Sequence, residues 1–117
     1  MVTARYIPDT GHVIKVDLDP SAGHEQSGWR PVMVLSPISY NRKTNLAVVV
    51  PVTNQVKGYP FEVLLPTQMK TTGVILTDQV RNLDWYARRA KYVEAAPAEI
   101  LKTVRERLIA LLGLAKA

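Results

Sequence analysis

Residues 25–37 of this 117-residue chain read EQSGWRPVMVLSP, and this stretch decides how the chain folds. A polar, glycine-containing loop delivers Arg30 and Pro31 into an apolar run that ends at Ser36. Short runs rich in branched residues and bounded by turn residues are typical of strands, and a proline is tolerated at a strand's first position. We therefore expect a loop over residues 19–28 and a strand over residues 31–35.

The remaining pattern predicts more short strands and one closing helix. Residues 46–52, LAVVVPV, are almost continuously apolar, as in a strand buried on both faces. We expect a mainly β (α+β) fold, a small β-barrel followed by a helix, with Gly113 ending the helix. The other predicted strands span residues 12–18, 61–65, 74–76 and 88–93, and the helix carries an apolar stripe of Ile100, Val104, Leu108, Leu111 and Leu112.

Length and composition exclude several classes to which this protein could belong. The length predicts a single domain over residues 1–117. The absence of cysteine excludes disulfides and thiolate metal sites, and the two histidines are not at ligand spacing, so we expect no metal and no cofactor. A net charge of +5 favours a polyanionic partner, although a merely basic protein is the alternative. The apolar runs are too short to span a bilayer, so we expect a cytoplasmic protein with no membrane association.

Two residues suit chemistry on a phosphate. The planar guanidinium of Arg30 can hold two phosphate oxygens at once and stays charged, which stabilises a developing negative charge. The hydroxyl of Thr53, directly after the third predicted strand, can bind a phosphoryl oxygen. From the residues alone the alternatives stay open: Arg30 could pair with Glu25 or Asp17 on the surface, and Thr53 could form a strand-end turn.

Other residues of the same loops are candidates for a proton transfer or for contacts with RNA. Glu25 could act as the general base or orient Arg30, and His24 is a weaker proton shuttle. Lys57 lies at the tip of a glycine-containing loop, where it could contact phosphate or simply be solvated. The remaining candidate RNA contacts are Gln26, Trp29, Tyr59 and Ser36, of which the aromatic ones could stack on bases. For Trp29 a contact in a dimer or with a protein partner is equally open.

Two further segments have ambiguous patterns. Residues 78–80, DQV, are expected to form a turn that closes the barrel rather than a catalytic motif. Residues 88–91, RRAK, form a basic cluster that either widens an RNA footprint or is a solvated face.

Three ordered segments resemble the MazF/PemK family of toxin endoribonucleases: residues 5–14 (RYIPDTGHVI), residues 25–37 and residues 51–63 (PVTNQVKGYPFEV). The resemblance covers nearly the whole chain and is weaker after Asp84. It implies an SH3-like barrel with a C-terminal helix, the CcdB/MazF/PemK-like fold. It also implies that Arg30, in the Arg-Pro motif, pairs with Thr53, in the Pro-x-Thr motif, as the catalytic core.

The same resemblance implies a function. The chain would be the toxin of a type II toxin-antitoxin system, a metal-independent, sequence-specific endoribonuclease (mRNA interferase) that causes growth arrest. It would cleave single-stranded RNA through the 2′-hydroxyl, leaving a 2′,3′-cyclic phosphate and a 5′-hydroxyl. The implied partners are messenger RNA, with ribosomal or transfer RNA as alternatives, an acidic MazE-like antitoxin, and a second copy in a homodimer.

Two alternatives share this predicted fold. One is a non-enzymatic toxin similar to the CcdB gyrase poisons, and the other is an RNA-binding barrel without activity. The gyrase poisons act through a C-terminal Trp-Gly-hydrophobic tail, whereas residues 112–117 read LGLAKA and contain no tryptophan.

Overall fold

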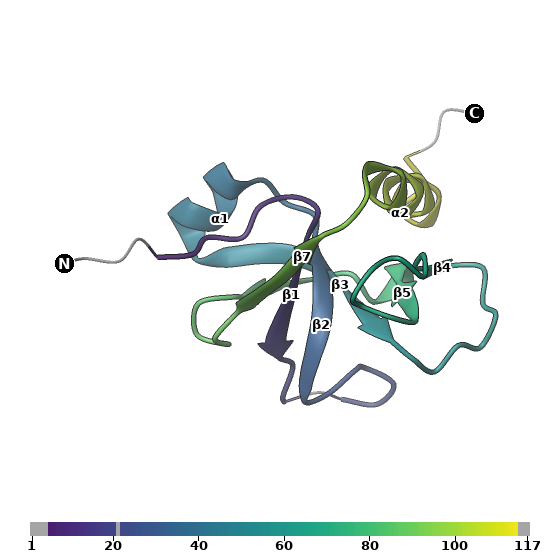
Figure 1. Cartoon of the computed structure of the whole chain (residues 1–117), viewed down its shortest axis with the longest axis horizontal. Helices are drawn as coiled ribbons and strands as arrows, with labels where there is room; N and C mark the ends of the chain where they lie inside the picture. Colours follow the sequence, from purple (N-terminus) through teal and green to yellow (C-terminus); the bar gives the residue numbers. More distant parts are fainter. Residues whose placement is uncertain (1–4, 21, 115–117) are drawn as a thin grey trace.

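The computed structural model describes residues 5–20 and 22–114 as an antiparallel β-structure with two α-helices (Figure 1). In chain order the elements are β1 (His12–Asp17), β2 (Trp29–Val34), α1 (Ile38–Thr44), β3 (Leu46–Thr53), β4 (Glu62–Leu64), β5 (Val74–Leu76), the 3₁₀ turn η1 (Thr77–Gln79), β6 (Arg81–Asp84), β7 (Lys91–Ala95) and α2 (Ala98–Leu111).

Strand β3 pairs with three other strands. On one side it pairs with β2. On the other side its first half pairs with β6, from Leu46 to Val49, and its last two residues pair with β5. Pro51 lies between those two pairings, so a residue without an N–H occupies the point at which β3 changes partner. The strand order is therefore β4-β5-β3-β2-β1-β7, with β6 attached beside β3.

The sequence predicted a closed barrel, and the structure does not confirm closure. Among the described residues, no ladder joins β6 to β7, so the rolled sheet stays open along that edge. The two strands are instead joined by the turn of residues 85–90, and Trp85 at the start of this turn is buried. The ladder between β1 and β7 also contains an irregularity between Val13 and Ile14. An irregular edge of this kind bends a strand away from continuous pairing.

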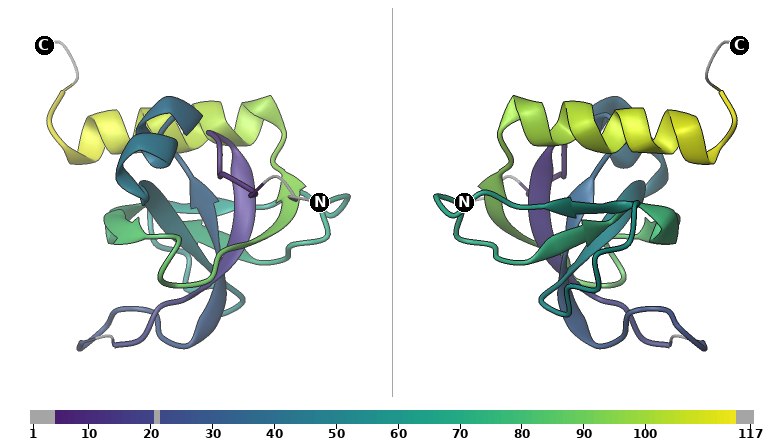
Figure 2. Two further views of the ribbon diagram at one scale, coloured as in Figure 1. Left: turned by 90° about the vertical axis from the view of Figure 1, so that its left-hand side faces the viewer. Right: turned by 90° about the vertical axis from the view of Figure 1, so that its right-hand side faces the viewer.

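Alternate residues of the central strands face two separate apolar cores, which explains why these strands are apolar throughout. One core contains Ile14, Val32 and Trp85 and lies inside the roll of the sheet. The other lies between the opposite face of the sheet and helix α2, which contributes Ile100 and Val104 (Figure 2). Because side chains alternate along a strand, burial on both faces requires an uninterrupted apolar run.

Most predicted elements are confirmed, and three differ. Residues 40–45 were predicted only as a polar break, but helix α1 covers most of them and is capped by Asn45 in the left-handed conformation (φ 60). Strand β6 was missed, because its residues RNLD lack an apolar alternation. Strand β7 begins at Lys91 rather than residue 88. Helix α2 was predicted correctly, and Gly113 follows it with φ 69.

Asn41 ties four segments together from a fully buried position. Its Nδ2 donates to the carbonyl oxygens of Pro8 and Ser36, each at 2.9 Å, and its Oδ1 accepts from the Ser36 hydroxyl at 2.6 Å. Its carbonyl oxygen accepts from Nε1 of Trp85 at 3.0 Å. The Ser36 hydroxyl in turn accepts from the backbone N–H of Val48. A fully satisfied buried network of this kind fixes how the segments dock.

We expect Asn41→Ala to lower the free energy of unfolding by about 2 kcal/mol, because it leaves buried partners without hydrogen bonds. Urea denaturation measures the change. Asn82→Ala is the matched control, since Asn82 is exposed and only donates to the Tyr40 hydroxyl. It should change stability by less than about 0.5 kcal/mol. Equal losses of unfolding free energy in both variants would show that the buried network contributes no more to stability than an exposed hydrogen bond.

Candidate active site

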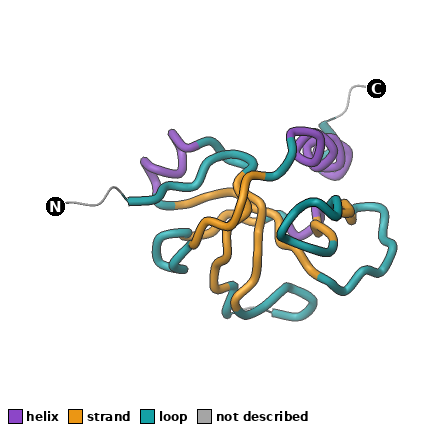
Figure 3. The backbone as a smooth tube through the Cα atoms, viewed as in Figure 1, coloured by secondary structure: helices purple, strands orange, loops and turns teal. Residues whose placement is uncertain are grey.

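The register of the sheet brings Arg30 and Thr53 together. Val32 on β2 is opposite Pro51 on β3, and the same antiparallel register continued by two residues places Arg30 beside Thr53. The loop before Arg30, between β1 and β2, and the loop after Thr53, between β3 and β4, consequently lie at the same end of the sheet (Figure 3). Two sequence motifs that lie far apart along the chain thus become neighbours.

Arg30 and Thr53 line one hollow of about 230 Å³, together with Glu25 and Gln26. The Arg30 side chain is exposed, and its Nε donates to the carbonyl oxygen of Ser27 at 3.1 Å. This bond holds the guanidinium by its inner nitrogen and leaves the two terminal nitrogens for a ligand. All three residues proposed from the sequence as catalytic therefore lie around one hollow.

The Thr53 hydroxyl is presented from a buried side chain. Thr53 is 5% exposed, and its Oγ1 accepts from the backbone N–H of Gln55 at 3.1 Å. A hydroxyl that accepts from the backbone keeps its own hydrogen available for an incoming oxygen. Gly73 on the neighbouring segment allows this packing, since a Cβ there would lie 2.1 Å from the Thr53 carbonyl oxygen. Its φ of +108 also disfavours any other residue.

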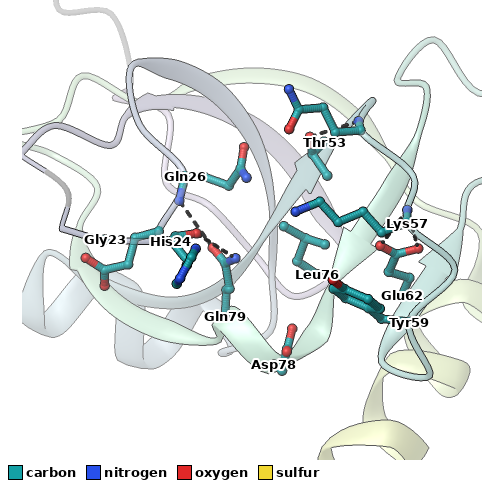
Figure 4. Close-up of a pocket in the computed structure, with 12 residues that line it drawn as sticks. Gly23, His24, Gln26, Thr53, Lys57, Tyr59, Glu62, Leu76, Asp78 and Gln79 are labelled. Atoms are coloured by element: carbon teal, nitrogen blue, oxygen red, sulfur yellow. Dashed lines mark hydrogen bonds between the residues drawn. The ribbon is translucent and has the colours of Figure 1, made fainter.

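A larger groove of about 560 Å³ adjoins this hollow and shares Glu25, Gln26 and Thr53 with it. Lys57 and Tyr59 form one wall, and Figure 4 shows the Lys57 side chain extending into the pocket from that side. The Lys57 ammonium nitrogen lies 5.9 Å from the centre of the Tyr59 ring. A cation beside an aromatic ring is suited to a nucleotide, which carries both a phosphate and a base.

Glu62 fixes the loop that carries Lys57. Its carboxylate accepts from the backbone N–H of Lys57 at 3.1 Å and from that of Gly58 at 2.8 Å. The Glu25 carboxylate similarly accepts from the N–H of Ala22 at 2.9 Å. Two of the acidic groups in the groove are therefore bound to backbone donors, which offset part of their negative charge.

Gln79 holds the opposite wall, the loop between β1 and β2. Its Oε1 accepts from the N–H of Gln26, and its Nε2 donates to the carbonyl oxygen of His24, each at 3.2 Å (Figure 4). One side-chain amide thus satisfies a donor and an acceptor of the loop backbone, as a neighbouring strand would. This pairing positions the backbone on either side of Glu25.

The structure does not bring every predicted residue into the groove. Trp29 is 44% exposed at the start of β2, and strand alternation directs it away from the face that carries Arg30. Ser36 lies at the other end of β2, where its hydroxyl bonds Asn41 and Val48. We therefore leave Ser36 out of the site, because its polar atoms already serve the fold. The stacking role of Trp29 stays a prediction.

Sequence reasoning undervalued several residues that line the groove. Residues 78–80 were predicted as a turn, and η1 confirms a turn there, but Asp78 and Gln79 also line the groove. The sequence motif DQV at residues 78–80 could have marked both Asp78 and Gln79 as site residues. Glu62 and Gln55 line the groove as well, and nothing in the spacing of the sequence marked either of them.

The part of the chain that the structure describes contains no group of three or more metal-ligating side chains. No helix in that part has both the length and the apolar character needed to cross a bilayer. The site is therefore built from an arginine, a lysine, a threonine and hydrogen-bonding side chains around an open groove.

Fold and site define a class of small, mainly β protein with a phosphate-compatible groove at one end of an antiparallel sheet. Residues 9–112 match the family model described as PemK-like, MazF-like toxin of type II toxin-antitoxin system. The chain belongs to this family of toxins.

Individual relatives agree over nearly the whole chain. The Endoribonuclease toxin MazF of Escherichia coli (strain K12) is 46% identical over 112 residues, which cover 96% of this chain and all of that protein. A crystal structure of MazF from Deinococcus radiodurans has a TM-score of 0.90 and 50% identity, covering 93% of this chain and 99% of that one. A MazE-MazF structure from the same organism has a TM-score of 0.85 and 44% identity, covering 95% and 100%.

We expect Gln79→Ala to loosen the loop between β1 and β2, because it removes two hydrogen bonds worth about 1 kcal/mol each. Amide hydrogen exchange at Gln26 should accelerate by about tenfold. Gln55→Ala is the control, since Gln55 lines the same groove from the other loop. Unchanged exchange at Gln26 in the first variant would show that Gln79 does not hold this loop.

Proposed function

We propose that this chain is a metal-independent, sequence-specific endoribonuclease and the toxin of a type II toxin-antitoxin system. The observation that carries the proposal is the shared hollow of Arg30, Thr53 and Glu25, which adjoins a groove of about 560 Å³ lined by Lys57 and Tyr59. Its substrate class is single-stranded RNA, messenger RNA above all, because unpaired bases can splay into such a groove.

The chemistry follows from what the residues can do to a phosphodiester. The 2′-oxygen of the substrate attacks phosphorus, and the bond from phosphorus to the 5′-oxygen breaks. The 2′-hydroxyl proton leaves to a base, and the departing 5′-oxygen gains a proton. The products are a 2′,3′-cyclic phosphate and a 5′-hydroxyl.

Each residue of the hollow has a distinct task in this scheme. Arg30 neutralises the charge that develops on the phosphoryl oxygens. Thr53 donates its hydroxyl hydrogen to one of those oxygens. Glu25 accepts the 2′-hydroxyl proton or orients Arg30, and its carboxylate is within the same hollow for either task. Lys57 contacts a neighbouring phosphate, and Gln26 and Tyr59 contact bases along the groove.

We also propose two protein partners. A related Deinococcus radiodurans chain has been solved as MazE-MazF, and we propose a cognate MazE-like antitoxin that covers the RNA groove of this chain. We further propose a homodimer with isologous contacts, the commonest arrangement of soluble oligomers. Release of the toxin would cleave messenger RNA and arrest growth, which places its action in the cytoplasm.

The shape of the rolled sheet is also relevant to this proposal. We propose that the rolled sheet is an open form of the SH3-like barrel implied by the MazF/PemK resemblance. The connection of β6 to β7 through the turn of residues 85–90, with Trp85 buried beside it, supports this interpretation.

The decisive experiment incubates purified protein with RNA in EDTA, using one substrate with ribose throughout and one with deoxyribose at the cleaved position. We expect cleavage of the first in chelator, and binding without cleavage of the second, because the nucleophile is the 2′-hydroxyl. Activity that is lost in EDTA and restored by magnesium would reject this mechanism. An absence of cleavage in all conditions would favour an RNA-binding protein or a gyrase poison.

Arg30→Ala should reduce the cleavage rate by about 10² to 10³ while the fold survives, because the arginine is exposed and stabilises mainly the transition state. Single-turnover kinetics measure the rate, and circular dichroism checks the fold. Arg42→Ala, which removes an exposed cation from α1, is the control and should cleave at the wild-type rate. A wild-type rate in Arg30→Ala would remove Arg30 from the mechanism.

Thr53→Ala should lower the single-turnover rate strongly, by about tenfold or more, whereas Thr53→Ser should keep part of the activity. The reason is that serine retains the hydroxyl that we assign to a phosphoryl oxygen. If alanine and serine behave alike, the hydroxyl is not the group that matters.

A further inference from the structure

A second surface combines exposed aromatic rings with cations, and none of its residues lines the groove described above. Two adjoining hollows, of about 690 Å³ and 270 Å³, share Tyr6, Ala90 and Lys91. We call this surface the aromatic-basic patch. It consists of Arg5, Tyr6, His12, Tyr86, Arg89, Lys91 and Tyr92.

Three rings of the patch form a fixed platform. Tyr6 stacks on His12 with centroids 5.9 Å apart, and Tyr92 packs edge-on against both, at 5.6 Å and 5.0 Å. The Tyr6 hydroxyl lies 2.8 Å from Nδ1 of His12, and the N–H of Asp9 donates to the same nitrogen at 3.3 Å. Nδ1 is therefore an acceptor, and the hydroxyl donates to it. Burial raises the pKa of Tyr6 well above its ordinary value, so the tyrosine keeps the proton that it donates.

The platform remains open to a ligand. Tyr92 is 50% exposed and Tyr86 is 55% exposed. Rings exposed to this extent are available to stack on the bases of a single strand.

Cations surround these rings. The Arg5 guanidinium lies 4.6 Å from the centre of the Tyr86 ring, and Arg89 and Lys91 line the same hollow. Arg89 is held at φ 56, a strained conformation for a residue with a side chain, and such strain tends to persist at functional positions. The nearby Asp84 carboxylate already accepts from the N–H of Ala87 at 2.7 Å.

The patch and the groove are connected through strand β1. Leu18, just after β1, lines a hollow next to the groove, and His12 at the start of β1 lines the patch. The six residues of β1 span about 20 Å. Beside the end of β1, the Arg88 guanidinium donates to the carbonyl oxygens of Asp17 and Asp19 at 2.8 Å.

We propose that the aromatic-basic patch is a second RNA-binding site, which holds single-stranded RNA that flanks the cleaved position. Stacking platforms with interleaved cations are what proteins use to bind single strands without reading their sequence. RNA fits the patch better than an apolar protein surface, because Arg5, Arg89 and Lys91 lie beside the packed rings and a phosphate backbone would neutralise their charges. The inference rests on the proposed RNA cleavage and extends its footprint.

The test compares two RNAs in the full chain: the shortest oligonucleotide that the wild type binds, and the same oligonucleotide extended at both ends by unstructured uridines. Each carries deoxyribose at the cleaved position, and fluorescence anisotropy measures binding. Tyr92→Ala should weaken binding of the extended RNA by about tenfold or more and leave the short RNA unchanged. Tyr92→Phe keeps the ring and should bind both RNAs as the wild type does.

Charge gives an independent arm of the test. Lys91→Ala should reduce the salt dependence of binding by about one unit in slope for the extended RNA only. Lys102→Ala is the control, because it removes an exposed cation from α2, and no residue of α2 lines either hollow of the patch. The short RNA with ribose throughout, assayed for cleavage in the same variants, reports separately on the proposed enzyme function.

Three results would overturn the inference. Equal losses on the short and the extended RNA would mean that Tyr92 acts through the groove. No loss on either RNA would mean that the patch does not bind RNA. A change of molecular mass in Tyr92→Ala, measured by light scattering, would assign the patch to an interface between two copies of the chain.

Discussion

The shared strand β3 is the constraint on which the rest of the structure depends. It pairs with β2 on one side and with two different strands on the other, and it divides two apolar cores. A strand in this position must be apolar on both faces, which leaves only its ends for polar chemistry. Thr53 is at one of these ends, and its side chain is buried except toward the hollow.

Rigid strands therefore carry the two groups proposed to act on the phosphate, and loops carry the groups proposed to contact the rest of the RNA. Arg30 and Thr53 are fixed by β2 and β3. Lys57 lies on a loop that Glu62 restrains, and Gln26 lies on a loop that Gln79 restrains. This division suits an enzyme that must position one phosphate accurately yet adapt to a flexible single strand, because loops move more easily than a sheet.

Two acidic residues of the groove are also restrained by hydrogen bonds from the backbone. A net charge of +5 attracts RNA to the protein as a whole, but it does not by itself place a cation at the scissile phosphate. Within the groove, carboxylates such as Glu25 and Glu62 accept hydrogen bonds from backbone N–H groups. Those bonds offset part of the negative charge beside Arg30 and Lys57, and they restrain the loops at the same time.

The sequence by itself determined the elements whose signal is local. The apolar run of β3 and the stripe and glycine stop of α2 were readable, because period and turn chemistry act over a few residues. The Arg-Pro and Pro-x-Thr motifs were recognised through their resemblance to the MazF/PemK family. Strand β6 and helix α1 were not readable. β6 is ordered by its pairing with β3, and α1 by the contacts of Asn41 with distant segments.

Only the tertiary structure decided which residues meet. The register of β2 on β3 sets Arg30 beside Thr53 and separates both from Ser36, which lies just beyond the opposite end of β2. The pairing of Gln79 with the loop of Gln26 joins residues that no spacing rule connects. Register and loop docking depend on how whole surfaces pack, and a sequence pattern records which face is apolar but not which strand will cover it.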